Sequence, residues 1–248
     1  MSVISFDKNS VISIYSTGIE SIIYKYKYGS KIIFLKIFKK EIGSEKETIK
    51  IVDKDFLLNK QKKIEIIPKT NCLSNEVSIL GPVIYNNEFI GYAMEIDERY
   101  LKTASYYDKR KIKIEVLKQL KNKIEIFNSN GVHIGDIKES NILLAKDGSI
   151  KLGDLDNYKI GNLDIDLPSI FVKEYRQRVS SDENLDNYCF NLFTIAYIEG
   201  IYLPYIKKYI RVEGVPKCLD TKENREIIDS MMHLDDTYKK RYLIDYMK

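Results

Sequence analysis

The chain has 248 residues, of which 44% are hydrophobic and 31% charged, a balance typical of folded globular proteins. Its 40 basic and 36 acidic residues leave a net charge of +4, too mild and too evenly spread to indicate nucleic acid as a partner. The sequence opens without a leader-like segment and contains no apolar run of membrane-spanning length, so we expect no membrane association and a cytoplasmic location. Three cysteines without metal-ligand spacing are expected to be reduced thiols.

Residues 11–39 alternate apolar and polar side chains in the manner of β-strands. Tyr28-Gly29-Ser30-Lys31 interrupts this alternation at a turn, and an earlier loop contains Gly18. We therefore predict strand, tight loop, strand, turn and strand. The third strand carries Lys36, with Phe34 two positions before it.

A helix is predicted within Asp55–Ile67, followed by a loop over residues 68–75. Two strands, Val77–Leu80 and Phe89–Met94, flank the turn residues Asn86-Asn87. A long amphipathic helix is then predicted over Lys109–Asn128, because apolar side chains recur there at helical spacing.

The segment Gly131–Tyr158 contains the most informative pattern in the chain. Ile142-Leu143-Leu144 is typical of a buried strand, Lys146-Asp147-Gly148 favours a tight hairpin turn, and residues 149–153 alternate as a second strand. Such a hairpin places Asp154, at the end of the second strand, close to Asn141 at the start of the first.

Asp136, Asn141 and Asp154 are thereby expected to converge on one site. Phosphoryl transfer needs such a set: one carboxylate takes the proton of the acceptor hydroxyl, while an Asn and a second Asp hold magnesium against the phosphates. The alternative interpretation is two solvated turns between strands.

The spacing of these residues resembles that of the eukaryotic-type protein kinase superfamily. Asn141 follows Asp136 by five positions and Asp154 follows Asn141 by thirteen, as in the family pattern H-x-D-x-K-x-x-N with a later D-F-G. The resemblance is to divergent, bacterial-looking members. It implies a single α+β domain with the two-lobed protein kinase-like fold, a small antiparallel-sheet lobe to about residue 95 and a mainly helical lobe over residues 96–248.

The resemblance also implies roles for residues at matching positions. Asp136 would be the catalytic base, Lys138 would steady the γ-phosphate of ATP, and Asn141 and Asp154 would hold Mg2+. In the first lobe, Lys36 would contact the α- and β-phosphates; the alternative is a lysine on the wet face of a strand. The other implied nucleotide-binding residues are Gly18, Ile23, Met94, Glu95 and Asp97.

Several positions depart from the family pattern. Phe34 stands where a small residue usually contacts adenine, and only Gly18 remains of the glycine-rich loop. The helix Glu that normally pairs with the lysine is replaced by Lys60 or Gln61, with Glu65 as the nearest candidate. Ile134 occupies the place of the family's His, and His133 beside it is expected to support the loop by hydrogen bonding.

The second half of the chain carries positions that the resemblance assigns to structure. Asp186 would accept backbone hydrogen bonds from the catalytic loop, and Glu174 would form a salt bridge with Arg241. Asp156 replaces the glycine of D-F-G, where it would add a metal ligand or face solvent. Helices are predicted over Asn224–Met232 and Thr237–Met247.

Together these observations predict an ATP- and Mg-dependent Ser/Thr protein kinase that acts on a protein substrate or partner. The first alternative is a catalytically inactive pseudokinase that senses nucleotide or binds a protein. The second is a small-molecule kinase on the same fold.

Overall fold

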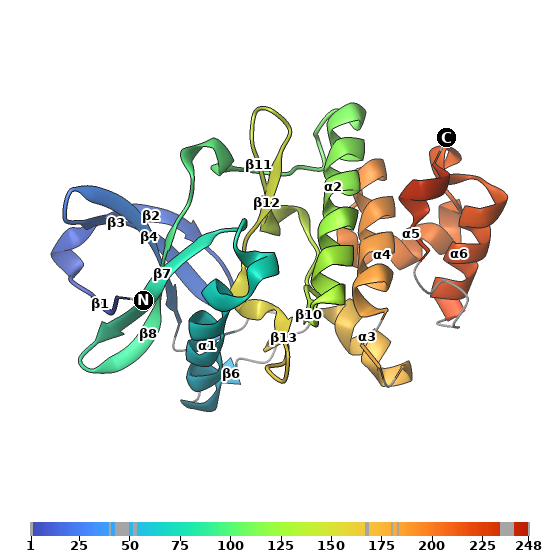
Figure 1. The fold of residues 1–248 in the computed structure, drawn as a ribbon. Coiled ribbons are helices and arrows are strands. Elements are labelled where there is room, and N and C mark those ends of the chain that lie inside the picture. The colour runs from blue at the N-terminus through green and yellow to red at the C-terminus, as the bar shows by residue number, and fades with distance from the viewer. Residues whose placement is uncertain are drawn as a thin grey trace. The chain divides into compact units, whose positions relative to one another are not determined.

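The structure is a computed structural model that describes residues 2–39, 41–42, 50–51, 54–166, 169–179, 181–182, 184–233 and 241–247. Within these residues the chain forms two compact units, Met1–Glu98 and Arg99–Lys248 (Figure 1). An antiparallel-rich sheet dominates the first unit and helices dominate the second. This confirms the predicted α+β fold with a sheet-rich lobe first and a helical lobe second.

The sheet of the first unit has the strand order β1-β7-β8-β4-β3-β2, and all neighbours are antiparallel except the short β1 beside β7. The predicted succession of strands over residues 11–39 is confirmed. Asn86 and Asn87 both have positive φ, which suits a tight hairpin turn because its twist matches that of the strands. The strands are β1 (Ile4–Ser5), β2 (Val11–Thr17), β3 (Ser21–Tyr28), β4 (Lys31–Phe38), β7 (Ser78–Tyr85) and β8 (Glu88–Glu95). Two short strands, β5 (Glu41–Ile42) and β6 (Lys50–Ile51), pair separately.

The two faces of this sheet carry different side chains because residues alternate along a strand. One face holds an apolar cluster that includes Leu35 of β4 and Ala93 of β8. On the opposite face the ring of Phe38 meets Phe56 of α1 (Lys54–Ile66) at a centroid distance of 5.9 Å. The helix predicted within Asp55–Ile67 is confirmed, and it covers the face of the sheet on which Lys36 lies.

The second unit is organised around two helices that lie side by side, α2 (Arg110–Ser129) and α4 (Leu185–Glu199), as Figure 1 shows. In α2 the buried apolar side chains recur every three or four residues, which confirms the predicted amphipathic helix. In α4 every residue from Leu185 to Tyr197 is buried. The other helices are α3 (Ile170–Arg178), α5 (Ile206–Glu213) and α6 (Lys222–His233), and the short strands are β9 (Lys102–Thr103), β10 (Val132–His133), β11 (Ile142–Leu144), β12 (Ile150–Leu152) and β13 (Lys159–Ile160).

The predicted helix Asn224–Met232 is confirmed within α6, but the one over Thr237–Met247 is wrong for its described part. Residues 237–240 lie outside the described residues, and Leu243–Tyr246 forms a short 3₁₀ helix, η10. The buried Asn191 side chain accepts from the Leu243 N–H and donates to the Arg241 carbonyl. These bonds satisfy backbone groups that an α-helix would otherwise pair internally.

No single helix among the described residues is long and apolar enough to cross a membrane. One pair of consecutive helical segments is long and apolar enough only when its two members are taken together, and these are bent by 105° relative to each other. The two segments are Leu185–Glu199 and Leu203–Glu213.

Candidate active site

The loop between β10 and β11 carries three of the predicted site residues. The Nζ of Lys138 lies 2.5 Å from an Oδ of Asp136, and the amide nitrogen of Asn141 donates to the Asp136 carbonyl at 3.1 Å. The same amide lies 3.4 Å from the Asp136 carboxylate. The side chain of Asp136 is 17% exposed and that of Lys138 is 40% exposed, so both remain within reach of a solvent-borne ligand.

A buried carboxylate at the start of α4 holds this loop. Asp186 is fully buried and accepts hydrogen bonds from the backbone N–H groups of Ile134, at 2.9 Å, and Gly135, at 2.7 Å. Burial raises the pKa of Asp186, although these two bonds oppose the rise. The expected anchoring role of Asp186 is thus confirmed. His133 lies beside the anchor, with its Nδ1 3.8 Å from the Asp186 carboxylate.

Gly135 has a backbone conformation that favours glycine, and it lies close to Ile165. Its φ of +67° lies in the left-handed region, and a Cβ there would come within 2.5 Å of a methyl group of Ile165. The backbone just before Asp136 is therefore held by the Asp186 hydrogen bonds in a conformation that glycine adopts readily.

The predicted hairpin after Asn141 is confirmed. β11 pairs antiparallel with β12, with Ile142 opposite Leu152, and Gly148 adopts a φ of +85° at the turn. The Gly153 N–H donates to the Asn141 carbonyl at 2.9 Å. Asp154 therefore begins next to the backbone of Asn141, as the spacing of the two residues predicts.

Asp154 and Asp156 form a close pair of carboxylates. Asp154 adopts left-handed backbone angles, φ 60° and ψ 31°, which are costly for a residue with a Cβ and often occur at functional sites. An oxygen of Asp154 and one of Asp156 lie within 4.8 Å of each other. Asp156 is completely buried, so the alternative in which it faces solvent is wrong. Carboxylate oxygens are among the donors that magnesium prefers, so Asp154 and Asp156 have the chemistry and proximity to hold such an ion. The role of Asn141 as a further ligand stays a prediction.

In the first unit, Lys36 lies on β4 opposite Ile23 of β3 and Tyr92 of β8. It is 3% exposed, so the alternative of a lysine on a wet strand face is wrong. Its Nζ lies 2.8 Å from an Oε of Glu20, in the loop between β2 and β3. The second Oε of Glu20 lies 3.5 Å from the Nζ of Lys60 on α1.

The family pattern does not indicate Glu20 as the partner of Lys36. Glu65, the predicted candidate on α1, is exposed, and within the described part of the chain it makes no ion pair with Lys36. A usable signal was present in the sequence, because Glu20 is the only acidic residue between Val11 and Lys39. A buried lysine on one of these strands would favour that carboxylate as its nearest partner along the sheet.

The remaining predicted nucleotide-binding residues of the first unit lie on β8 or in the segments next to the strands. Gly18 has no structural need to be glycine, since an added Cβ would sit 3.6 Å from the Ser21 carbonyl, an ordinary contact. Met94 is buried on β8 opposite Phe34. Glu95 ends β8 with an exposed side chain, and Asp97 follows two residues later. Their roles toward a nucleotide stay predictions.

Phe34 is buried, and its ring contacts that of Tyr15 edge-on at a centroid distance of 4.9 Å. Tyr15 lies on β2, so the two rings connect the outer strand of the sheet to β4. The large side chain of Phe34 therefore takes part in an aromatic contact within the sheet.

The segment that follows Asp156 is held by ion pairs. Arg176 of α3 contacts both Asp164 and Asp182 at 2.7 Å, and Lys159 contacts Asp182 at 2.8 Å. Burial alone would raise the pKa of Asp182, but the hydrogen bonds from Arg176 and Lys159 outweigh it and lower the pKa to about 2. This network ties the last turn of α3 to the segments that precede and follow the helix.

The predicted salt bridge between Glu174 and Arg241 is wrong. Glu174 contacts Lys207 of α5 at 2.6 Å, while Arg241 lies 3.5 Å from Glu226 of α6. Lys207 lies on a neighbouring helix but 33 residues away from Glu174 in the sequence. No local sequence pattern indicates such a pairing.

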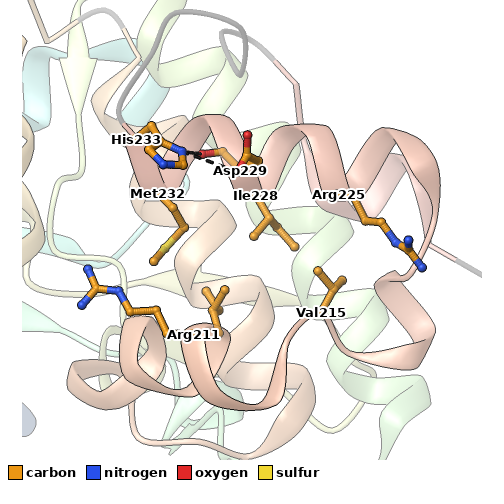
Figure 2. A pocket seen from close by; sticks show the side chains of 8 residues that line it. Arg211, Val215, Arg225, Ile228, Asp229, Met232 and His233 are labelled. Atoms are coloured by element: carbon orange, nitrogen blue, oxygen red, sulfur yellow. Dashed lines mark hydrogen bonds and ion pairs between the residues drawn. The ribbon is translucent and has the colours of Figure 1, made fainter.

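A separate pocket of about 590 Å³ lies between α5 and α6 (Figure 2). Ile228 and Met232 provide apolar surface, and Arg225 at one end is held by an ion pair with Asp220. None of the predicted site residues lines this pocket. Its lining residues are Ile210, Arg211, Val215, Arg225, Ile228, Asp229, Met232 and His233.

No protein-family model matches the chain. Among characterised proteins it is similar to the serine/threonine-protein kinase ste20 of Aspergillus oryzae and to pakA of Talaromyces marneffei. Each is 24% identical over 203 aligned residues that cover 71% of this chain. A serine/threonine-protein kinase ste20 of Emericella nidulans is similar to the same degree. The chain spans 24% to 32% of the length of these relatives. The similarity supports a distant protein kinase-like relationship.

Proposed function

We propose that this chain is an ATP- and Mg-dependent phosphotransferase whose acceptor is a Ser or Thr hydroxyl of a protein in the cytoplasm. The observation that carries the proposal is the Asp136 carboxylate with the Lys138 ammonium and the Asn141 amide against it, on a loop anchored by Asp186. A carboxylate held in this way is placed to accept the proton of an acceptor hydroxyl. The distant similarity to Ser/Thr kinases supports the same reaction.

In this proposal Asp136 is the base and Lys138 steadies the transferred phosphoryl group. Asn141 and Asp154 hold magnesium, with the buried Asp156 as a further candidate ligand; the ion supplies neutralisation of phosphate charge. Lys36 contacts the α- and β-phosphates of ATP. The purine lies against Ile23 and Met94, and the loop at Gly18 and the backbone of Glu95 and Asp97 complete the nucleotide site.

The test is incorporation of labelled phosphate from Mg·ATP into a general protein substrate and into the chain itself. The Asp136→Asn variant is expected to lower the rate by about 10²- to 10⁴-fold, because it removes the base while keeping the shape of the side chain. Asp147→Asn, in the exposed hairpin turn, is the matched control and is expected to keep the wild-type rate. Equal rates in Asp136→Asn and wild type would overturn the role of Asp136.

One observation favours the alternative of a pseudokinase. Phe34 is buried against Tyr15 and opposite Met94, the strand positions at which a purine is expected. A pseudokinase whose purine site is filled by Phe34 would bind a protein partner and show neither stabilisation by Mg·ATP nor phosphate transfer. A nucleotide-sensing pseudokinase would be stabilised by Mg·ATP without transferring phosphate. At a hundred times its dissociation constant a ligand adds about 2.7 kcal/mol to the free energy of unfolding. A Tm shift that Asp154→Asn abolishes, without label incorporation in wild type, would support this alternative.

A further inference from the structure

We propose that Glu20 is the positioning residue of Lys36: its carboxylate, supplied by the loop between β2 and β3, holds the Lys36 ammonium where nucleotide phosphates bind. This inference deepens the proposed function and rests on it. It also assigns Lys60 a role, as the residue by which α1 binds the other oxygen of the same carboxylate.

The geometry of the three charges carries the inference. One oxygen of Glu20 lies 2.8 Å from Lys36 Nζ, a charge-assisted hydrogen bond, and the other lies 3.5 Å from Lys60 Nζ. The side chains are 11%, 3% and 0% exposed, respectively, so water contributes little to their solvation. Buried charges persist when they are paired, and a single carboxylate here serves two ammonium groups.

Aromatic rings surround the two ammonium groups. Lys36 Nζ lies 5.8 Å from the centre of the Phe38 ring and 5.9 Å from that of Tyr92. Lys60 Nζ lies 5.6 Å from the same Phe38 ring and 5.2 Å from that of Phe56. Cations are attracted to ring faces at such distances, so the rings stabilise both lysines in their charged form while excluding water.

The backbone of Glu20 is fixed to the sheet. The Lys39 N–H donates to the Glu20 carbonyl at 2.8 Å, and the Gly18 N–H donates to the Ser21 carbonyl at 2.9 Å. The Lys39 ammonium also donates to the Gly18 carbonyl at 2.5 Å. Because β3 and β4 are paired along their whole length, the carboxylate and Lys36 are carried by one rigid element. The sheet side of the unit thus supplies a carboxylate partner for Lys36, through Glu20, whereas Glu65 of α1 is exposed.

The test compares Glu20→Gln with Glu65→Gln, its matched control on α1, in the full chain. Calorimetry with Mg·ATP measures binding that uses the phosphates, and calorimetry with adenosine measures binding that does not. We expect Glu20→Gln to weaken Mg·ATP binding by at least about tenfold, with adenosine binding unchanged and Glu65→Gln equal to wild type. Equal losses for ATP and adenosine, or a loss in Glu65→Gln alone, would overturn the inference.

A second readout does not need a nucleotide. Nitrogen-15 NMR of lysine side chains is expected to show slowly exchanging ammonium signals from Lys36 and Lys60 in wild type and to lose that of Lys36 in Glu20→Gln. If Glu20→Gln is too unstable, the double variant Glu20→Gln/Lys60→Met removes one buried cation together with the carboxylate, and it should fold while still binding Mg·ATP weakly.

The outcomes separate the two proposals. If wild type and Glu20→Gln bind Mg·ATP equally well, the proposed role of Glu20 is overturned and the proposed function stands. Wild type that binds no Mg·ATP overturns the proposed function and this inference with it, even where the ammonium signals report the ion pair.

Discussion

Asp186 and Gly135 show how single residues shape the candidate site. Asp186 lies in the first turn of α4, yet both of its oxygens are used by the loop that carries Asp136. The loop N–H groups would be buried without a partner if this carboxylate were absent. The position of Asp136 therefore depends on a residue 50 positions later in the sequence, one that touches no reacting group.

We expect Asp186→Asn to lower the free energy of unfolding by about 1 to 3 kcal/mol, because an amide accepts through only one atom and leaves one buried N–H unpaired. Urea denaturation measures this loss, and label transfer from ATP should fall with it. Asp229→Asn, whose parent side chain is 77% exposed, is the control and should change stability by less than about 0.5 kcal/mol. Equal stability of the two variants would contradict the anchoring role.

A pH dependence is expected from Asp182. Arg176 and Lys159 lower its pKa from 3.8 to about 2. A lowered pKa of an acid stabilises the folded state above the unfolded pKa, and this contribution is lost as the pH falls from about 4 to about 2. Allowing for partial solvent exposure, we expect about 1 to 2 kcal/mol.

The measurement is the free energy of unfolding of wild type and Asp182→Asn between pH 6 and about pH 2. The difference between them should be constant above about pH 5 and shrink as the pH falls. A difference that does not change with pH would show that the ion pairs of Asp182 contribute nothing to stability.

At the scale of elements, the close approach of β4 and β8 sets the position of Lys36. Gly91 lies opposite Ile37, and a Cβ at this glycine would meet the Lys36 carbonyl at 2.0 Å and the Ile37 Cα at 3.0 Å. Both obstacles are backbone atoms, which cannot turn aside as a side chain can. A side chain at position 91 therefore requires the two strands to separate beside Lys36.

We expect Gly91→Ala to destabilise the chain by about 1 to 3 kcal/mol, the usual cost of overfilling a close contact. Thermal unfolding measures the loss, and hydrogen exchange should become faster in β4 and β8. Gly18→Ala is the matched control, because its new methyl group would make only an ordinary contact. A Gly91→Ala variant as stable as Gly18→Ala would contradict the described register of β4 and β8.

At the scale of the whole molecule, each unit encloses its own core. A buried cysteine in the core of the second unit reports whether that core is closed. Cys189 lies on α4 and is 4% exposed, whereas Cys72 and Cys218 are half-buried. Burial raises the pKa of the Cys189 thiol well above its ordinary value, so that little reactive thiolate forms.

Thiol labelling of the native full chain should therefore modify Cys72 and Cys218 first. We expect Cys189 to react at least about a thousandfold more slowly than in denaturant, since it reacts only when the core around α4 opens. Mass spectrometry of labelled peptides separates the three sites. Labelling of native Cys189 at the rate of Cys218 would show that this core opens locally.

The sequence by itself determined the features that depend on local spacing. The hairpin between Ile142 and Leu152, and with it the approach of Asp154 to Asn141, follows from residues fewer than twenty apart whose turn chemistry permits one geometry. Helix α2 follows in the same way, because a period of three to four residues defines its buried face.

The tertiary structure decided which charges meet. The family resemblance implied an α1 carboxylate for Lys36 and Arg241 for Glu174, whereas the fold supplies Glu20 and Lys207. Long side chains such as lysine reach partners on any neighbouring element, and the cost of leaving a buried charge unpaired selects whichever partner the assembled core brings close. Such pairings depend on three-dimensional distance, which residue order alone does not determine.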